Sequence, residues 1–154
     1  MSSRQIRLTF TESGESVVAD LLENEAPRIC EAVWNMLPLE KKMIHGMYSG
    51  PEVFMVLEKP QEIPRENDVQ LPLPGEILYF YDSGTSAGGG NRAVSEICIV
   101  YARGVSLKQH DGVPTFASLF ARVPGDWKRD WTGFAAACRR IRTDRSSPLR
   151  IERV

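Results

Sequence analysis

The sequence predicts a mainly β protein of the α+β class, with about eight short strands and two helices. Short apolar or alternating segments recur along the chain, and stretches containing Gly and Pro separate them. Two other segments carry apolar residues at helical spacing. Because strands this short leave exposed edges unless the sheet closes, we expect a closed, mostly antiparallel β-barrel of about eight strands, with a helix capping each end.

The first two predicted strands lie close together near the N-terminus. Residues 4–11 alternate, with Ile6, Leu8 and Phe10 on one face and polar residues on the other. Ser13-Gly14 predicts a turn. Residues 16–22 follow and are almost continuously apolar, which is typical of a strand covered on both faces.

The clearest predicted helix runs directly from this second strand. Asn24 is the expected N-cap, Pro27 falls in the first turn, and Pro38 ends the helix. Its apolar residues recur at steps of three and four and form one stripe: Ala26, Ile29, Cys30, Val33, Trp34 and Leu37.

The remaining elements are predicted from the same patterns. Residues 43–57 should hold two strand pieces around Ser49-Gly50-Pro51, and the Pro-rich residues 60–75 should form a surface loop. Asp130 is expected to cap a second helix through its side chain. Further strands are predicted at residues 77–82, 96–103, 116–123 and 149–154.

Size and composition are those of one ordinary domain spanning residues 1–154, with 42% hydrophobic and 25% charged residues. No apolar run approaches the roughly 20 residues of a membrane helix, and the N-terminus lacks a signal-peptide core. Cys30, Cys98 and Cys138 are far apart and have no CxxC spacing, which suits reduced thiols. We therefore expect a cytoplasmic location and no membrane partner.

Several of these stretches resemble cyclophilins in order and spacing over about residues 4–125. The strand leading into residues 24–34 is similar to the early strand and helix of that family. Residues 74–80 and 95–102 are similar to its next strand pair, and residues 117–123 to a later strand. The chain most resembles a divergent bacterial and archaeal group with a cyclophilin-like fold and no assigned function. The resemblance implies a cyclophilin-like barrel with an outer groove.

In cyclophilins the prolyl nitrogen accepts a hydrogen bond from a guanidinium group inside an apolar groove, which stabilises the transition state for isomerisation. In the matching positions of this chain, Gly46 stands where that Arg is expected. Cys98 replaces an aromatic wall residue, and Ala117 replaces a His. We therefore predict no useful prolyl isomerase activity and assign no catalytic residue.

The same groove positions are rich in polar groups, which favours a small-molecule site. A His between carboxylates can act as an acid or base near neutral pH, so a prolyl isomerase or another small enzyme using a His45/Glu52 pair is the alternative. A structural role is also open, in which His45 satisfies a hydrogen bond at a strand end and Glu52 is solvated. The candidate ligand-binding residues are His45, Tyr48, Ser49, Glu52, Tyr79, Tyr81, Glu96 and Arg122.

Other functional classes have less support. Two His and isolated Cys residues do not supply the three or four ligands of a metal site, and Gly88-Gly89-Gly90 leads into a strand, so neither a metal nor another cofactor is expected. The basic residues near the C-terminus lack exposed aromatic neighbours, so nucleic-acid binding is not expected. A solvated face or a contact between copies of the chain in a homo-oligomer explains them better.

Overall fold

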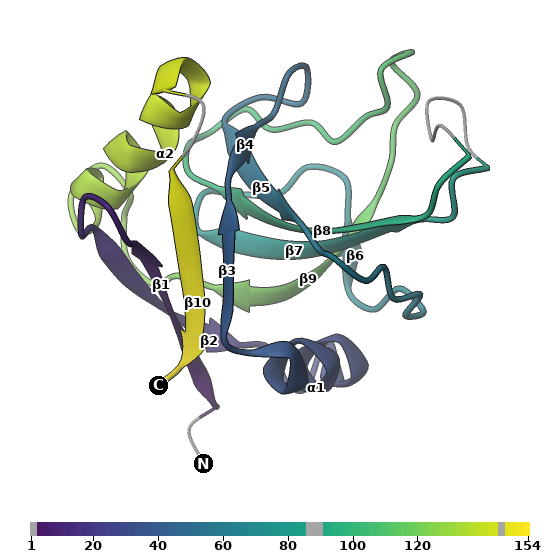
Figure 1. The fold of residues 1–154 in the computed structure, drawn as a ribbon, viewed down its shortest axis with the longest axis horizontal. Helices are drawn as coiled ribbons and strands as arrows, with labels where there is room; N and C mark the ends of the chain where they lie inside the picture. The colour runs from purple at the N-terminus through teal and green to yellow at the C-terminus, as the bar shows by residue number, and fades with distance from the viewer. Residues whose placement is uncertain (1–2, 86–90, 145–146) are drawn as a thin grey trace.

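The computed structural model describes residues 3–85, 91–144 and 147–154 (Figure 1). Gly88, Gly89 and Gly90 of the predicted Gly-rich loop lie outside the described residues. The helices are α1 (Pro27–Met36) and α2 (Thr132–Asp144). The strands are β1 (Gln5–Phe10), β2 (Ser16–Leu21), β3 (Leu39–Lys42), β4 (Ile44–His45), β5 (Glu52–Val56), β6 (Asp68–Val69), β7 (Glu76–Asp82), β8 (Val94–Val100), β9 (Ala117–Arg122) and β10 (Pro148–Arg153).

All ten of these strands belong to one antiparallel sheet. Nine of them follow the order β3-β10-β1-β2-β9-β7-β8-β5-β4, and β6 pairs with β9 beside this path. Strand β8 pairs with β7 on one side and with β5 on the other, so these three strands form a continuous surface. The prediction of a mainly β fold with two helices is therefore confirmed.

The expected closed barrel of eight strands is wrong. The order of hydrogen-bonded strands begins at β3 and ends at β4, and among the described strands these two form no ladder with each other. They are consecutive along the chain, with Met43 between them, and each pairs with a different neighbour: β3 with β10, and β4 with β5. The sheet is therefore open, and a short stretch of chain joins its two ends without a ladder.

The first two predicted strands are confirmed as β1 and β2. In β2 the residues Val17, Ala19 and Leu21 are buried, while those between them are more exposed. The prediction that both faces of this strand are covered was therefore too strong. One face of β2 packs into the core and the other remains partly exposed, as in ordinary antiparallel sheets.

The predicted first helix is confirmed as α1, but its N-cap is not Asn24. The cap position is Ala26, whose side chain makes no capping hydrogen bond. Instead, Glu66 from the loop before β6 accepts hydrogen bonds from the backbone N–H groups of Arg28 and Ile29, at 2.8 and 2.9 Å. A carboxylate at this end also interacts favourably with the helix dipole.

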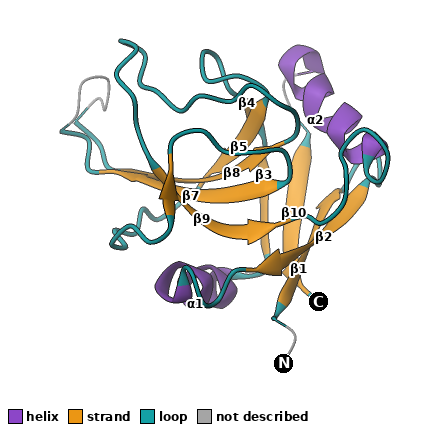
Figure 2. Cartoon of the chain, turned by 180° about the vertical axis from the view of Figure 1, so that it is seen from behind, coloured by secondary structure: helices purple, strands orange, loops and turns teal. Residues whose placement is uncertain are grey.

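The second predicted helix is confirmed as α2, and the expected face is buried at Phe134, Cys138 and Ile141. Asp130 does not follow the prediction, because its carboxylate accepts a hydrogen bond from the backbone N–H of Asp126, before the helix. The two helices lie at opposite ends of the molecule in both ribbon views (Figures 1 and 2). No helix formed by the described residues is long and apolar enough to span a bilayer.

Strands β5, β7, β8 and β9 contribute side chains to two separate hydrophobic clusters. Residues such as Val53, Ile77 and Ile97 face the main core, which also receives both helices. Leu78 and Cys98 belong instead to a smaller cluster with Leu107, Ala117 and Leu119. Since successive residues of a strand point to opposite faces, the smaller cluster marks the outer face of the sheet. The candidate site is on this face.

Candidate functional site

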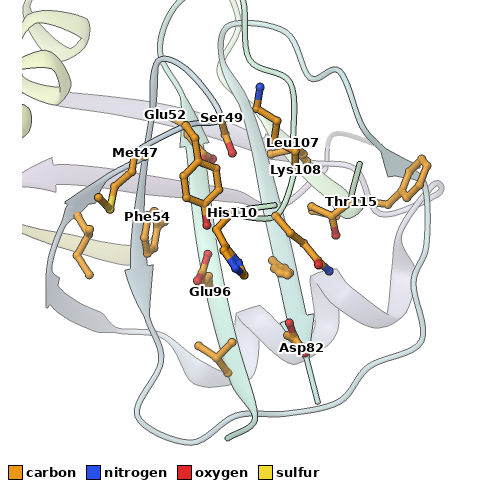
Figure 3. A pocket seen from close by; sticks show the side chains of 18 residues that line it. Met47, Ser49, Glu52, Phe54, Asp82, Glu96, Leu107, Lys108, His110 and Thr115 are labelled. Carbon is orange, nitrogen blue, oxygen red and sulfur yellow. The ribbon is translucent and has the colours of Figure 1, made fainter. Parts of the chain in front are cut away.

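A pocket of about 280 Å³ opens on the outer face of β7, β8 and β5 (Figure 3). The strands form its floor. One wall is the segment 46–49 between β4 and β5, and the other is the segment 107–116 that precedes β9. The pocket thus brings together parts of the chain about sixty residues apart in sequence.

Strand alternation explains which side chains line the floor. Phe54 lies opposite Cys98 in the β5–β8 ladder, and Phe80 lies opposite Glu96 in the β7–β8 ladder. Glu52 is two residues from Phe54 and therefore shares its face. Carboxyl groups and aromatic rings are consequently neighbours on one surface of the sheet.

Glu52 is the most unusual residue of the pocket. It is 6% exposed, and its Oε2 atom is buried without a hydrogen-bond partner. Burial, together with the nearby Glu96 carboxylate, raises the pKa of Glu52 from 4.5 to about 7. Gly46 makes room for this side chain, because a Cβ atom at position 46 would lie only 2.8 Å from Cγ of Glu52.

Glu96 lies further along the floor and is half-buried. Burial raises the pKa of its carboxyl group to about 7, and the Asp82 carboxylate acts in the same direction. The thiol of Cys98 donates a weak hydrogen bond to Oε1 of Glu96 over 3.8 Å. Burial also raises the pKa of the Cys98 thiol, as do both glutamates, so this cysteine stays protonated at neutral pH.

In the described part of the chain, no basic side chain forms an ion pair with either glutamate. None of the ion pairs formed within residues 3–85, 91–144 and 147–154 includes Glu52 or Glu96. The basic residues that line the pocket, Lys108 and His110, belong to the segment before β9. At neutral pH the two carboxyl groups can therefore gain or lose protons, which suits both proton transfer and the binding of a cation.

The pocket is also bordered by exposed apolar side chains. Met47 is 88% exposed, and Ile44, Tyr48 and Phe116 are exposed to about half that extent. Leu107 continues the apolar surface into the smaller hydrophobic cluster. An apolar mouth around a few polar groups is typical of small-molecule sites.

Four of the eight predicted site residues meet in this pocket: Tyr48, Ser49, Glu52 and Glu96. The pocket also contains Gly46 and Ala117, the positions where the resemblance had implied Arg and His. Glu52 was expected to be solvated if it had a structural role, and that expectation is wrong because the residue is buried.

The other four predicted residues lie elsewhere. The imidazole of His45 donates from Nδ1 to the carbonyl of Gly46 and accepts at Nε2 from the hydroxyl of Tyr101, over 2.8 and 2.7 Å. Tyr79 and Tyr81 pack with the main core on the opposite face of the sheet. Arg122 forms an ion pair with Glu76 at 2.8 Å.

Sequence reasoning missed several side chains that line the pocket. Phe80 and Asp82 alternate with the two tyrosines along β7 and therefore point to the opposite face of the sheet. They could have been identified once it was known which face carries the pocket. No sequence signal connected the segment 107–116 to β5. The missed residues are Ile44, Met47, Phe54, Phe80, Asp82, Val94, Leu107, Lys108, Gln109, His110, Thr115 and Phe116.

The acidic residues of the pocket are not arranged as the ligands of a metal ion. Among the described residues no group of three or more His, Cys, Asp and Glu side chains is placed to hold a metal ion. The arrangement is therefore best described as an apolar pocket with separate carboxyl groups on its floor.

Comparisons with known proteins extend the description of the fold. A family model described as "Protein of unknown function (DUF3830)" matches residues 8–152. None of the curated proteins matches the chain.

Two solved structures are similar in fold. The structure of McbB in complex with tryptophan has a TM-score of 0.68 at 17% identity, covering 96% of this chain and 44% of McbB. The solution structure of the hypothetical protein AF2241 from Archaeoglobus fulgidus has a TM-score of 0.55 at 16% identity, covering 99% of this chain and 96% of that protein. This chain thus spans less than half the length of McbB. At these identities the likeness concerns the fold.

Proposed function

The chain belongs to the DUF3830 family of proteins of unknown function, and we propose that it binds a small organic molecule in the pocket over β5, β7 and β8. The ligand has an apolar body and at least one positively charged or N–H group. The apolar part packs against Phe54 and Phe80, and the polar group faces Glu52 and Glu96.

The observation that carries this proposal is the buried, unpartnered carboxyl oxygen of Glu52 at the edge of a preformed pocket. A buried polar atom without a partner costs free energy, so such atoms are rare in folded proteins. A ligand that donates a hydrogen bond or carries a positive charge would remove this cost. McbB, of which this chain covers 44%, has been solved in complex with tryptophan, so tryptophan is one of the compounds to test.

A prolyl isomerase or a His45/Glu52 acid–base enzyme has less support. Both ring nitrogens of His45 already have hydrogen-bond partners, and the ring is outside the pocket that Glu52 lines. Acid–base chemistry by Glu52 and Glu96 remains compatible with ligand binding, because a group with a pKa near 7 exchanges protons readily at neutral pH.

The proposal is tested by blocking the pocket. Saturation-transfer NMR with a panel of amino acids, amines and aromatic acids, tryptophan included, should identify at least one binder. Thr115→Trp places a large side chain in the pocket and should abolish that signal, whereas Leu71→Trp, at an exposed position that does not line the pocket, should leave it unchanged. Binding that survives Thr115→Trp would place the ligand elsewhere, and a panel without any binder would contradict the proposal.

A further inference from the structure

The floor of the pocket carries three carboxyl groups in a row, one from each of three adjacent strands. Glu52 lies opposite Val100, which is four residues along β8 from Glu96, or about 13 Å. Asp82 lies opposite Val94, two residues to the other side of Glu96, or about 7 Å. Figure 3 shows Glu52, Glu96 and Asp82 following one another from the top of the view downward.

Two aromatic rings lie among these carboxyl groups. Phe54 follows Glu52 on the same face of β5, between the levels of Glu52 and Glu96, and Phe80 lies opposite Glu96 on β7. Both rings line the pocket and pack with the smaller hydrophobic cluster. The floor therefore offers apolar surface between Glu52 and Glu96 and beside Glu96.

Glu52 and Glu96 have no positively charged partner among the described residues. Glu52 is more than nine-tenths buried, its Oε2 atom has no partner, and neither Glu52 nor Glu96 takes part in an ion pair within the described residues. Carboxylates held in an apolar site favour a cation that can enter and pair with them.

The titratable groups that lie nearest the two glutamates carry no positive charge that could pair with them. Tyr48 faces them from the segment between β4 and β5, Cys98 from β8 and Asp82 from β7. Lys108 and His110 belong to the wall formed by residues 107–116. The negative charge is thus confined to the sheet, and the positive charge to the opposite wall.

We propose that the pocket holds a linear polyamine, a chain in which ammonium groups are separated by methylene segments. This inference rests on the proposed function of the same pocket. The ammonium groups face Glu52 and Glu96, and the methylene segments lie on Phe54 and Phe80. An ammonium group beside a carboxyl group favours its charged form, so binding displaces protons from the two glutamates.

Calorimetric titration of the whole chain with spermidine at pH 7, in two buffers of different ionisation enthalpy, tests the inference. Spermidine should bind at least tenfold more tightly than 2-phenylethylamine, which has one ammonium group, and 1,8-octanediol, which has none, should not bind. Because burial raises the pKa values of Glu52 and Glu96 to about 7, both groups are partly protonated at this pH, and spermidine binding should release protons to the buffer.

Two matched variants test whether spermidine binding depends on the carboxyl groups on the floor of the pocket. Glu96→Gln should weaken spermidine binding tenfold or more, because it removes one of the two carboxyl groups that face the ammonium groups. Glu62→Gln makes the same change at an exposed residue that does not line the pocket, and should leave binding unchanged. Circular dichroism establishes that both variants fold. Equal affinities for the two variants, or equal affinities for spermidine and 2-phenylethylamine, would overturn the inference.

The inference and the proposed function can fail separately. If spermidine does not bind while another probe binds and is blocked by Thr115→Trp, the polyamine is excluded and the small-molecule pocket stands. If no probe binds at all, both are contradicted.

Discussion

Gly46 and Glu52 are in direct contact across the β4–β5 turn, and the absence of a side chain at position 46 is what makes room for the Glu52 carboxyl group. A Cβ atom there would lie 2.8 Å from Cγ and 3.0 Å from Oε1 of Glu52. The backbone N–H of Gly46 also donates to the carbonyl of Glu52 over 2.9 Å. The position at which the cyclophilin resemblance implies an arginine therefore holds a residue that accommodates a carboxylate.

The first prediction concerns this contact. Gly46→Ala should force the Glu52 side chain to move within a packed site and lower the free energy of unfolding by about 1–3 kcal/mol. Urea denaturation measures the loss, and the ¹³C signal of the Glu52 carboxyl group reports the displacement. Gly133→Ala is the matched control, because its Cβ would meet Cγ of Glu15 at an ordinary 3.8 Å. It lies in a helix, where alanine is favoured over glycine, so it should not destabilise the protein. An unchanged Glu52 signal in Gly46→Ala would contradict the account.

The second prediction concerns the pH dependence of stability. The pKa of Glu52 is about 7 in the folded protein and 4.5 when exposed, so the folded state binds more protons between these values. The contribution of this proton to stability is complete below about pH 4.5 and is lost as the pH rises through 7, which amounts to about 3 kcal/mol at most.

Glu52→Gln should remove this loss. The thermal midpoint of the variant should therefore fall less between pH 5 and pH 8 than that of the parent protein, and at pH 8 the variant should be the more stable of the two. Glu62→Gln, at an exposed position, should keep the parental slope. Parallel curves for Glu52→Gln and the parent would show that the Glu52 carboxyl group does not titrate as described.

Most of the strands and both helices were predictable because their signals are local, whereas β6 lies within residues 60–75, which were predicted to form a loop. The alternation in residues 5–10 and the spacing of Ile29, Cys30 and Val33 each arise within one element. The open sheet was not predictable in this way. Strand β3 (Leu39–Lys42) is mostly charged, so it lacks the apolar alternation that identifies strands, and the sequence does not reveal which strands lie at the edges of the sheet.

The candidate site was half predictable for a related reason. Strand β7 is apolar on both faces through residue 80, so the sequence could not show which parity faces the pocket. The predicted site residues Tyr79 and Tyr81 pack with the main core, whereas Phe80 and Asp82, on the opposite face of the strand, line the pocket. The wall at residues 107–116 depends on the return of a long loop, which has no periodic signal.

The third prediction concerns the N-terminus of α1, where the capping residue comes from about forty residues away. Glu66→Ala should lower the free energy of unfolding by about 1 kcal/mol, because it removes the acceptor of two backbone N–H groups and a favourable charge at the helix dipole. Asn24→Ala, at the cap position that the sequence suggests, should change stability by less than about 0.5 kcal/mol. Urea denaturation of both variants measures which residue caps the helix. A larger loss of unfolding free energy for Asn24→Ala than for Glu66→Ala would show that Asn24 is the cap and contradict the prediction.

The fourth prediction concerns prolyl isomerisation, whose uncatalysed barrier is about 20 kcal/mol. Lowering it by the cyclophilin route requires a guanidinium group that donates to the prolyl nitrogen. Among the described residues no arginine lines the pocket, and Arg122 is paired with Glu76. The floor of the pocket presents carboxyl groups and not the guanidinium group that this route requires. We therefore expect the rate in a proline-peptide assay to stay at background. Acceleration well above background that is lost in Glu52→Gln would contradict this expectation, because it would show that the carboxyl group acts as an acid on the bound peptide. Acceleration that persists in Glu52→Gln and Thr115→Trp would point to a contaminating isomerase, since both changes alter the pocket.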